Sequence, residues 1–485
     1  MESAKTERRS FGLRAVRNLF ANSKARAGQP LQTGGSRDDQ LFAAVLETGR
    51  KFHITVAMLL LIVAWAFFAW VTQLWNGLGV TGLNRPVYWG FYITNFVFFI
   101  GISHAGTLIS AILRLANAEW RRSITRSAEV ITVLVLFFGV GNVLMDLGRP
   151  DRALNVISHA QFRSPLLWDV TSITTYLTAS SIYLFLPLIP DIALLRDRLH
   201  GYSAAGRPFP RWRLRLYTFL AVGWTGSEKQ QQRLNRAIGV MAVLVIPIAI
   251  SVHTVVSWVF AMTIQPMWHS TIFGPYFVAG AIFSGIAALL IAMAIIRRVY
   301  HLEDYLKPIH FNNLGLLLLV MTLAWLYFTI AEYLTSYYGG EPAHMKVFWA
   351  KISGPYAPEF WSMVVFCFVI PFAILTRRKT RTIAGTVVAS ASVTIGMWLE
   401  RFTIVVPTLM NPRLPYSRGA YHPSWVEFSI MAGCFAAFIL LYMLFTKLFP
   451  IVSIWEIREG QEKSVAETVE RIESYLPGVA AKEFP

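Results

Sequence analysis

The sequence is poor in charged residues and in cysteine. Only 15% of its 485 residues are charged, against about 25% in an ordinary soluble domain, whereas 55% are hydrophobic. This balance argues against a soluble protein. The two cysteines, Cys367 and Cys434, both lie within apolar stretches. They are too few for a cysteine-ligated iron–sulfur cluster or zinc site within the chain, and they give no sign of a disulfide framework.

Apolar stretches recur along the chain at the length that a helix needs to cross a bilayer, about 20 residues or more. No connecting segment is long enough to form a sizeable soluble core. The sequence therefore predicts an all-α integral membrane protein with ten transmembrane helices. We expect these helices at 52–75, 88–116, 126–147, 166–190, 235–264, 274–298, 311–336, 359–376, 383–409 and 424–449.

Basic residues are concentrated in alternate connecting segments. Lysine and arginine number 44 against 27 acidic residues, which gives a formal charge of +17. The connecting segments on one side of the predicted helices carry 19 of the basic residues, and those on the other side carry 8. In a membrane protein such an excess faces the cytoplasm, so it does not indicate binding to nucleic acid. With ten helices, this bias predicts that both termini are cytoplasmic.

A weak internal repeat indicates how the helices are grouped. Seven residues coincide when 88–115 is superposed on 272–299, and the two segments run in the same direction. We therefore expect two parallel-related four-helix bundles, at 88–264 and 265–409. The first helix with its loop (52–87) and the last helix (410–449) lie outside these bundles. The expected cytoplasmic segments are a basic N-terminal segment, a basic loop and a C-terminal tail, at 1–51, 191–234 and 450–485.

Ionisable side chains within the predicted helices are few. Each costs at least about 2.5–3.5 kcal/mol near the bilayer centre, so each calls for a partner or a function. Apart from Glu129 and Arg114, they lie near the middle of a helix or toward the end predicted to face outward. The candidate functional residues are His104, Glu129, Asp146, Asp169, His253, Glu332, Glu400 and Arg401.

Histidine and carboxylates in one half of a membrane suit the oxidation of a quinol. A neutral imidazole can accept a hydroxyl proton, and a carboxylate can relay that proton toward water. The same residues suit a proton-coupled transporter. His104 and His253 also suit axial ligation of a haem, although no predicted helix carries two suitably spaced histidines. The residues alone leave these alternatives open.

Several of these residues also have a purely structural interpretation. Asp146 lies three residues before Arg149, a spacing that allows an ion pair to close the helix. Glu400 is adjacent to Arg401, so the two charges can neutralise each other. A structural anchor that only holds redox subunits at the membrane is therefore a further alternative.

Extended sequence blocks around these residues resemble a known family. The blocks are YWGFYITNFVFFIGISHAGTLISAILRL, LMDLGRPDR, LLWDVTSITTYLTASSIYLFLPLIPD and SVHTVVSWVFAMTIQPMWHSTIFGPYFVAGAIFSGIAALL. Over about 50–450 the chain resembles the NrfD/polysulfide-reductase membrane-subunit family. Within that family it is most similar to the ten-helix quinol-oxidising membrane subunit of bacterial alternative complex III. Other members of the family are alternatives. They are the homologous second membrane subunit of that complex and the membrane anchors of hydrogenase or sulfur-respiration complexes.

The resemblance implies a multi-pass protein of the bacterial inner membrane that oxidises menaquinol to menaquinone near the periplasmic face. It implies that this chain itself binds no haem, no iron–sulfur cluster and no metal. The implied partners are a periplasmic iron–sulfur subunit, c-type haem subunits and a homologous NrfD-like membrane subunit. Electrons would pass to the iron–sulfur subunit, and protons would be released at the periplasmic side.

The resemblance also implies roles for the candidate residues. The catalytic pair that contacts the quinol would be His104 and Asp169. The quinol pocket, or its proton exit, would also be lined by Asp146 and His253. Candidates for a proton path are Glu129, Glu332, Glu400 and Arg401. The sequence leaves open whether protons are translocated.

Overall fold

The computed structural model describes residues 41–42, 45, 48–204, 210–415 and 420–461. The predicted segments 1–51 and 450–485 lie for the most part outside these residues. Within the described part of the chain, every regular element is a helix and no strand occurs. The all-α fold class is therefore confirmed.

Among the described residues, ten helical segments are long and apolar enough to cross a membrane, as the sequence predicts. Two of these spans are interrupted: α4 and α5 form one, and α14 and α15 form another around the π-helical segment Val365–Val369. The helices are α3 (Arg50–Asn76), α4 (Phe91–Ile102), α5 (His104–Leu115), α6 (Thr125–Asp146), α8 (Pro165–Ala204), α10 (Glu228–Ala261), α11 (Phe273–Val299), α12 (Pro308–Gly339), α14 (Ala357–Val364), α15 (Ile370–Thr376), α16 (Ile383–Leu409) and α17 (Trp425–Leu448).

The chain divides into two compact units. The membrane unit comprises 44–189 and 224–453. Of the described residues, the second unit includes 190–204 and 210–223, with the short helix α9 (Arg211–Leu220), and 454–461. Within the second unit, the carboxylate of Asp191 accepts hydrogen bonds from the backbone N–H groups of Ile454 (3.2 Å) and Trp455 (3.0 Å). This carboxylate joins two segments that are far apart in the sequence.

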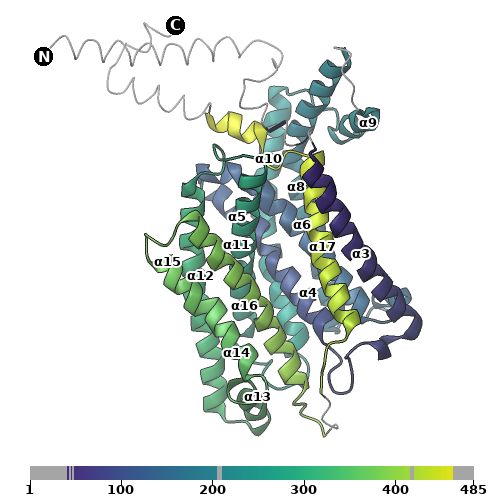
Figure 1. The fold of residues 1–485 in the computed structure, drawn as a ribbon, viewed down its shortest axis with the longest axis vertical. Helices are drawn as coiled ribbons and strands as arrows, with labels where there is room; N and C mark the ends of the chain where they lie inside the picture. The colour runs from purple at the N-terminus through teal and green to yellow at the C-terminus, as the bar shows by residue number, and fades with distance from the viewer. Residues whose placement is uncertain (1–40, 43–44, 46–47, 205–209, 416–419, 462–485) are drawn as a thin grey trace, which may run out of the picture. The chain divides into compact units, whose positions relative to one another are not determined.

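The membrane unit is a bundle of helices with α3 and α17 paired along one side (Figure 1). We call α4–α5, α6, α8 and α10 the first helix group, and α11, α12, α14–α15 and α16 the second helix group. Helix α11 packs against α4, α5 and α10 as well as against α12 and α16, so it joins the two groups. Helices α3 and α17 pack side by side. These names follow the predicted bundles; the division into two bundles and their relation by an internal repeat stay predictions, and the structure places all these helices in one compact unit.

Glu427, near the start of α17, connects three segments at one end of the membrane unit. Its Oε2 accepts hydrogen bonds from the backbone N–H groups of Gly82 (2.7 Å) and Ser424 (2.9 Å). Its Oε1 accepts one from the hydroxyl of Tyr421 (2.6 Å). Because the side chain is fully buried, this carboxylate has a structural role.

We expect Glu427→Ala to lower the free energy of unfolding by about 3 kcal/mol or more, because three donors lose a charged acceptor. Thermal unfolding of the purified protein measures this effect, with the exposed Glu303→Ala as the matched control. An unchanged transition in Glu427→Ala would show that water satisfies these donors equally well.

Candidate functional site

Helix α5 lies exceptionally close to two neighbouring helices. A Cβ atom on Gly285 of α11 would lie 2.6 Å from the backbone nitrogen of Ala105. A Cβ atom on Gly106 would lie 2.2 Å from the carbonyl oxygen of Ala128 in α6. Only glycine permits such close approach, so these two residues allow α5 to pack tightly between α6 and α11.

The junction between α4 and α5 positions His104. The carbonyl of Ser103 accepts hydrogen bonds from the hydroxyls of Thr132 in α6 (2.6 Å) and Tyr176 in α8 (3.0 Å). These bonds hold the junction from two sides. The next residue is His104, which begins α5 in the core of the first helix group.

His104 and His253 lie against each other in this core. Their ring centroids are 3.7 Å apart, with the ring planes inclined by 74°, and the side chains are 1% and 2% exposed. Among the described residues, no ring nitrogen of either histidine has a hydrogen-bond partner of good geometry. The carbonyl of Ala249 lies close to both rings, and that of Ile100 lies close to His253. Buried polar groups without partners are uncommon, so this pair is the strongest candidate for ligand contact.

The same geometry disfavours ligation of a haem. A metal ion held by two imidazoles, each about 2 Å away, requires a gap of about 4 Å between their nitrogens. Rings in edge-to-face contact leave no such gap. In the described ranges, no three histidine, cysteine or carboxylate side chains are placed to hold a metal ion.

Asp169 lies on the same buried face of α8 as Tyr176, whose ring centroid is 6.1 Å from that of His104. Asp169 and Tyr176 are seven residues apart, which corresponds to about two helical turns, or about 10 Å along the axis of α8. Asp169 is 8% exposed, and its Oδ1 has no hydrogen-bond partner within the described chain. Asp169 therefore lies about two turns along α8 from the tyrosine that packs beside His104.

A groove of about 580 Å³ lies on the other side of α8, where this helix meets α10. This volume is within the usual range for ligand sites. Four threonines of α8 line the groove, and each donates its hydroxyl to the carbonyl four residues earlier: Thr171, Thr174, Thr175 and Thr178. The α10 side is lined by Met241, Leu244 and Ile248. The groove is therefore largely apolar, and it lies across α8 from Asp169 and Tyr176.

Asp146 lies away from the histidine pair. It is at the end of α6, close to Tyr92, which precedes His104 by twelve residues and thus by about 18 Å along α4 and α5. The prediction that Asp146 pairs with Arg149 to close the helix is wrong, because Arg149 pairs with Asp151 at 3.0 Å instead. The Oδ1 of Asp146 has no hydrogen-bond partner among the described residues.

Glu129 belongs to a separate network in the first helix group. Its Oε1 accepts a hydrogen bond from Ser110 (2.7 Å), and the hydroxyl of Ser110 lies 3.2 Å from that of Tyr183 in α8. Ser110 follows His104 by six residues, or about 9 Å along α5. The Glu129 network therefore lies on the C-terminal side of His104 along α5, whereas Asp146 lies level with residues on the N-terminal side of His104.

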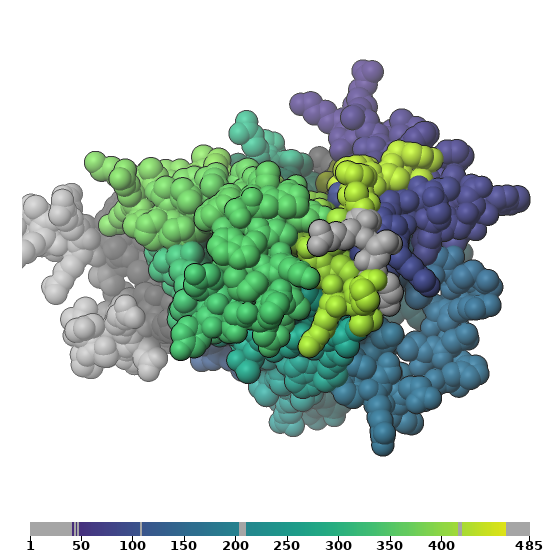
Figure 2. Space-filling model, turned by 90° about the horizontal axis from the view of Figure 1, so that it is seen from below, coloured from purple at the N-terminus to yellow at the C-terminus, as the bar shows by residue number. Residues whose placement is uncertain are grey.

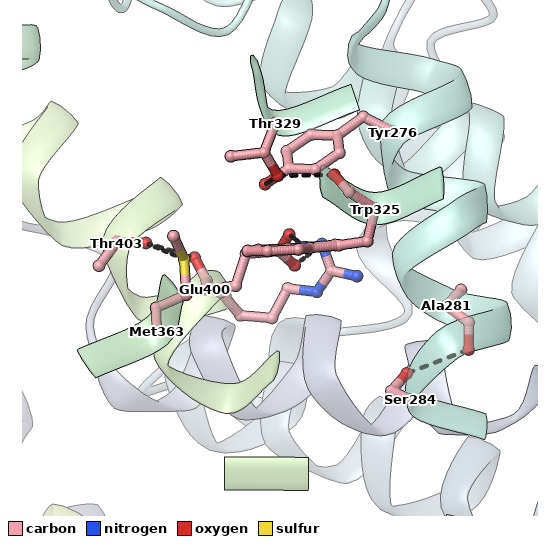
Figure 3. A network of polar contacts seen from close by, with 9 residues as sticks. Tyr276, Ala281, Ser284, Trp325, Thr329, Met363, Glu400 and Thr403 are labelled. Carbon is pink, nitrogen blue, oxygen red and sulfur yellow. Dashed lines mark hydrogen bonds and ion pairs between the residues drawn. The ribbon is translucent and has the colours of Figure 1, made fainter. Parts of the chain in front are cut away.

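Glu400 and Arg401 form a buried ion pair in the second helix group, and Figure 3 shows Glu400 beside Trp325. An Nη atom of Arg401 lies 2.9 Å from Oε2 of Glu400, and the indole of Trp325 donates to Oε1 of Glu400 at 2.6 Å. Thr329 donates to the carbonyl of Trp325 and approaches the hydroxyl of Tyr276 at 3.4 Å. The two opposite charges therefore compensate each other within the core.

Arg401 also lies at the contact between the two helix groups. Its guanidinium carbon is 4.9 Å from the ring centre of Phe277 in α11, and a Cβ atom on Gly280 would lie 2.6 Å from one of its Nη atoms. A Cβ atom on Gly101 of α4 would lie 4.0 Å from the same group. The positive charge is near enough to act on His253, so the ion pair and the histidine pair are electrostatic neighbours.

Several residues that lie next to the predicted ones could not be predicted from the sequence. Tyr176, Tyr276 and Trp325 are aromatic residues in apolar helices, where nothing in the sequence distinguishes them from packing residues. Lys351 is 4% exposed although it lies between two predicted spans. The apolar residues around it, which form helix α13 (Pro342–Ile352), are the signal that could have indicated its burial.

Comparisons with known proteins agree with the family resemblance. Residues 79–412 match the family described as polysulphide reductase, NrfD. A putative dimethyl sulfoxide reductase membrane subunit of Halobacterium salinarum is 30% identical over 50% of this chain and 51% of its own length. The chain therefore spans about half of that relative.

Two further relatives align over most of their length. A selenate reductase subunit of Mesobacillus selenatarsenatis is 24% identical over 83% of this chain and 94% of its own. The Hdr-like menaquinol oxidoreductase integral membrane subunit of Archaeoglobus fulgidus is 23% identical over 87% of this chain and 96% of its own. Because the family match covers well over half of the residues, the chain belongs to the polysulphide reductase NrfD family of membrane proteins.

Proposed function

We propose that this chain is the quinol-oxidising membrane subunit of a multisubunit redox complex, with menaquinol as its substrate. The observation that carries the proposal is the buried pair of His104 and His253, whose ring nitrogens have no good hydrogen-bond partner in the described chain. The name of the Archaeoglobus fulgidus relative, a menaquinol oxidoreductase subunit, supports the choice of substrate.

The proposed binding mode uses both sides of the contact between α8 and α10. The isoprenoid tail lies in the apolar groove, which opens away from the core. The head group passes between the two helices toward the region shared by His253, His104 and Asp169. In this binding mode the head group lies between Asp169 and the histidine pair, which are separated by about two turns of α8.

Quinol oxidation releases two protons and two electrons. A neutral imidazole can accept one hydroxyl proton, and we assign this step to His104. Asp169, with one free carboxylate oxygen, accepts the second hydroxyl proton or relays the first. The two electrons leave to an iron–sulfur cluster of a docked partner subunit. The protons leave at the end predicted to be periplasmic.

The resemblance of the sequence blocks supports a more specific assignment within this proposal. We assign the complex to the alternative complex III type, with this chain as its quinol-oxidising membrane subunit. Its partners are then a periplasmic iron–sulfur subunit, c-type haem subunits and a second NrfD-like membrane subunit. The basic connecting segments support a bacterial inner-membrane location with both termini in the cytoplasm.

Asp169→Asn in the intact complex tests the site. The amide keeps the shape of the side chain but cannot accept a proton, so we expect quinol oxidation to fall about 100-fold. Turnover with a soluble quinol analogue measures this effect, and the exposed Asp304→Asn is the matched control. Native turnover by an assembled Asp169→Asn complex would remove Asp169 from the reaction. The same outcome in a histidine variant would favour a quinone-inactive anchor.

A further inference from the structure

The second helix group contains a set of buried ionisable residues that quinol oxidation does not use. Glu332, near the end of α12, and Lys351, in α13, are each 4% exposed. The hydroxyl of Ser270 donates to Oε2 of Glu332, and the Nζ of Lys351 lies 5.8 Å from the ring centre of Tyr333. An acid and a base are thus buried at the same end of the second helix group.

A small cavity lies between these residues. Its volume is about 20 Å³, which is enough for a single water molecule. Its polar lining consists of Glu332, Lys351, Tyr276, Tyr333 and Thr403. These residues come from α11, α12, α13 and α16, so the cavity is built by the whole end of the helix group.

One atom of this cluster requires a partner that the described chain does not supply. The Oε1 of Glu332 is buried and has no hydrogen-bond partner among the described residues, while its Oε2 is bound by Ser270. A buried carboxylate oxygen without a partner is costly. A water molecule in the adjacent cavity, which both Glu332 and Lys351 line, would satisfy this oxygen and bridge toward Lys351.

We propose that Glu332, Lys351 and a water molecule in this cavity form a proton-exchange site at the α13 end of the second helix group. A proton leaves the ammonium group of Lys351, passes through the water and is accepted by the carboxylate of Glu332. The return transfer restores the two charges, so no oxidant or other reactant is needed. This inference does not depend on quinol oxidation.

The proposed site lies between the buried Glu400 on one side and α13 on the other. Toward the core, Tyr276 lines the cavity and also lies beside Glu400. Toward solvent, α13 covers the site, and its residue Lys346 is exposed. Figure 2 shows this end of the helices from outside, with green residues of the α12–α14 region in the middle of the face.

The electrostatic setting of Lys351 fits reversible exchange. Burial lowers the pKa of Lys351 to about 8, and the nearby Glu332 carboxylate opposes this shift. Among the described residues, the charged group that acts on Lys351 is Glu332, and the neutral side chains of Tyr276 and Tyr333 line the same cavity. Loss of the Glu332 charge must lower the pKa of Lys351 further.

Reductive methylation of the intact native complex, read by mass spectrometry across pH, tests the proposal. Formaldehyde modifies only the neutral amine, so we expect Lys351 to react with a midpoint near pH 8. In Glu332→Gln the midpoint moves down by about one pH unit or more, whereas Glu332→Asp, which keeps the charge, stays close to native. Modification of the exposed Lys346 in the same sample shows that the reagent is active.

Two results would overturn the proposal. One is a native complex in which Lys346 is modified but Lys351 stays unreactive between about pH 6 and about pH 10, because the site then has no access to water. The other is an unchanged midpoint in Glu332→Gln, because Lys351 and Glu332 are then uncoupled. The first result needs no variant and therefore holds even if Glu332→Gln fails to assemble. Neither result depends on quinol turnover, which is tested separately.

Discussion

Replacing His104 with alanine is expected to lower quinol oxidation by the intact complex about 100-fold or more. The imidazole is fully buried, and in the described chain neither of its nitrogens has a good hydrogen-bond partner, so in this account it is available to accept a quinol proton. Loss of a general base typically costs a factor of 10² to 10⁴, roughly, in rate. Steady-state turnover at saturating quinol analogue measures the effect.

The control for this variant is His53→Ala. His53 lies at the start of α3, is exposed and bonds only within its own helix end, to the carbonyl of Gly49. We expect native turnover in His53→Ala. Subunit assembly is measured in parallel, because an alanine at 104 also opens space beside His253. A fully assembled His104→Ala complex with native turnover would contradict the assigned role.

Replacing Arg401 with methionine is expected to produce the largest loss of stability in the membrane unit. Glu400 is 1% exposed and would remain as a buried charge without its compensating partner. Breaking a buried ion pair in this way costs about 3–5 kcal/mol. The substitution also removes the packing of the guanidinium on Phe277 and against Gly280. We expect a clear fall in the unfolding temperature of the purified subunit.

Two further variants separate charge from packing at this position. Arg401→Lys keeps the positive charge and is expected to retain part of the stability, while the exposed Arg378→Met is expected to behave as native. The double variant Arg401→Met with Glu400→Gln removes both charges and should recover part of the loss. Equal unfolding temperatures for Arg401→Met and the native protein would contradict the argument from charge burial.

Much of the fold follows from the sequence because bilayer thickness sets the length of each apolar run. The helix expected at 52–75 is α3 at Arg50–Asn76, and the one expected at 424–449 is α17 at Trp425–Leu448. The interruption of the second span at Ser103 is harder to predict. It depends on hydrogen bonds from α6 and α8, which a single stretch of sequence does not contain.

The candidate site could be predicted only in part, because residue type does not give helix rotation. His104 and His253 are 149 positions apart, and their contact depends on how α5 and α10 pack. Asp146 and Asp169 are predicted toward the outer ends of their helices and His104 near the middle of its own, and the structure separates both carboxylates from the rings by helical turns. The burial of Lys351 depends on how α13 folds back over the end of α12.

The central claim is that a quinol binds between the α8–α10 groove and the histidine pair. Fluorescence titration of the intact complex with a quinol-site inhibitor tests it most directly, using the native protein, His104→Ala and the groove-filling Thr175→Trp. We expect saturable quenching in the native complex and affinities at least about tenfold lower in both variants, since each change removes more than about 1.4 kcal/mol of binding. Absence of saturable binding in the native complex, or equal affinity in all three proteins, would contradict the account.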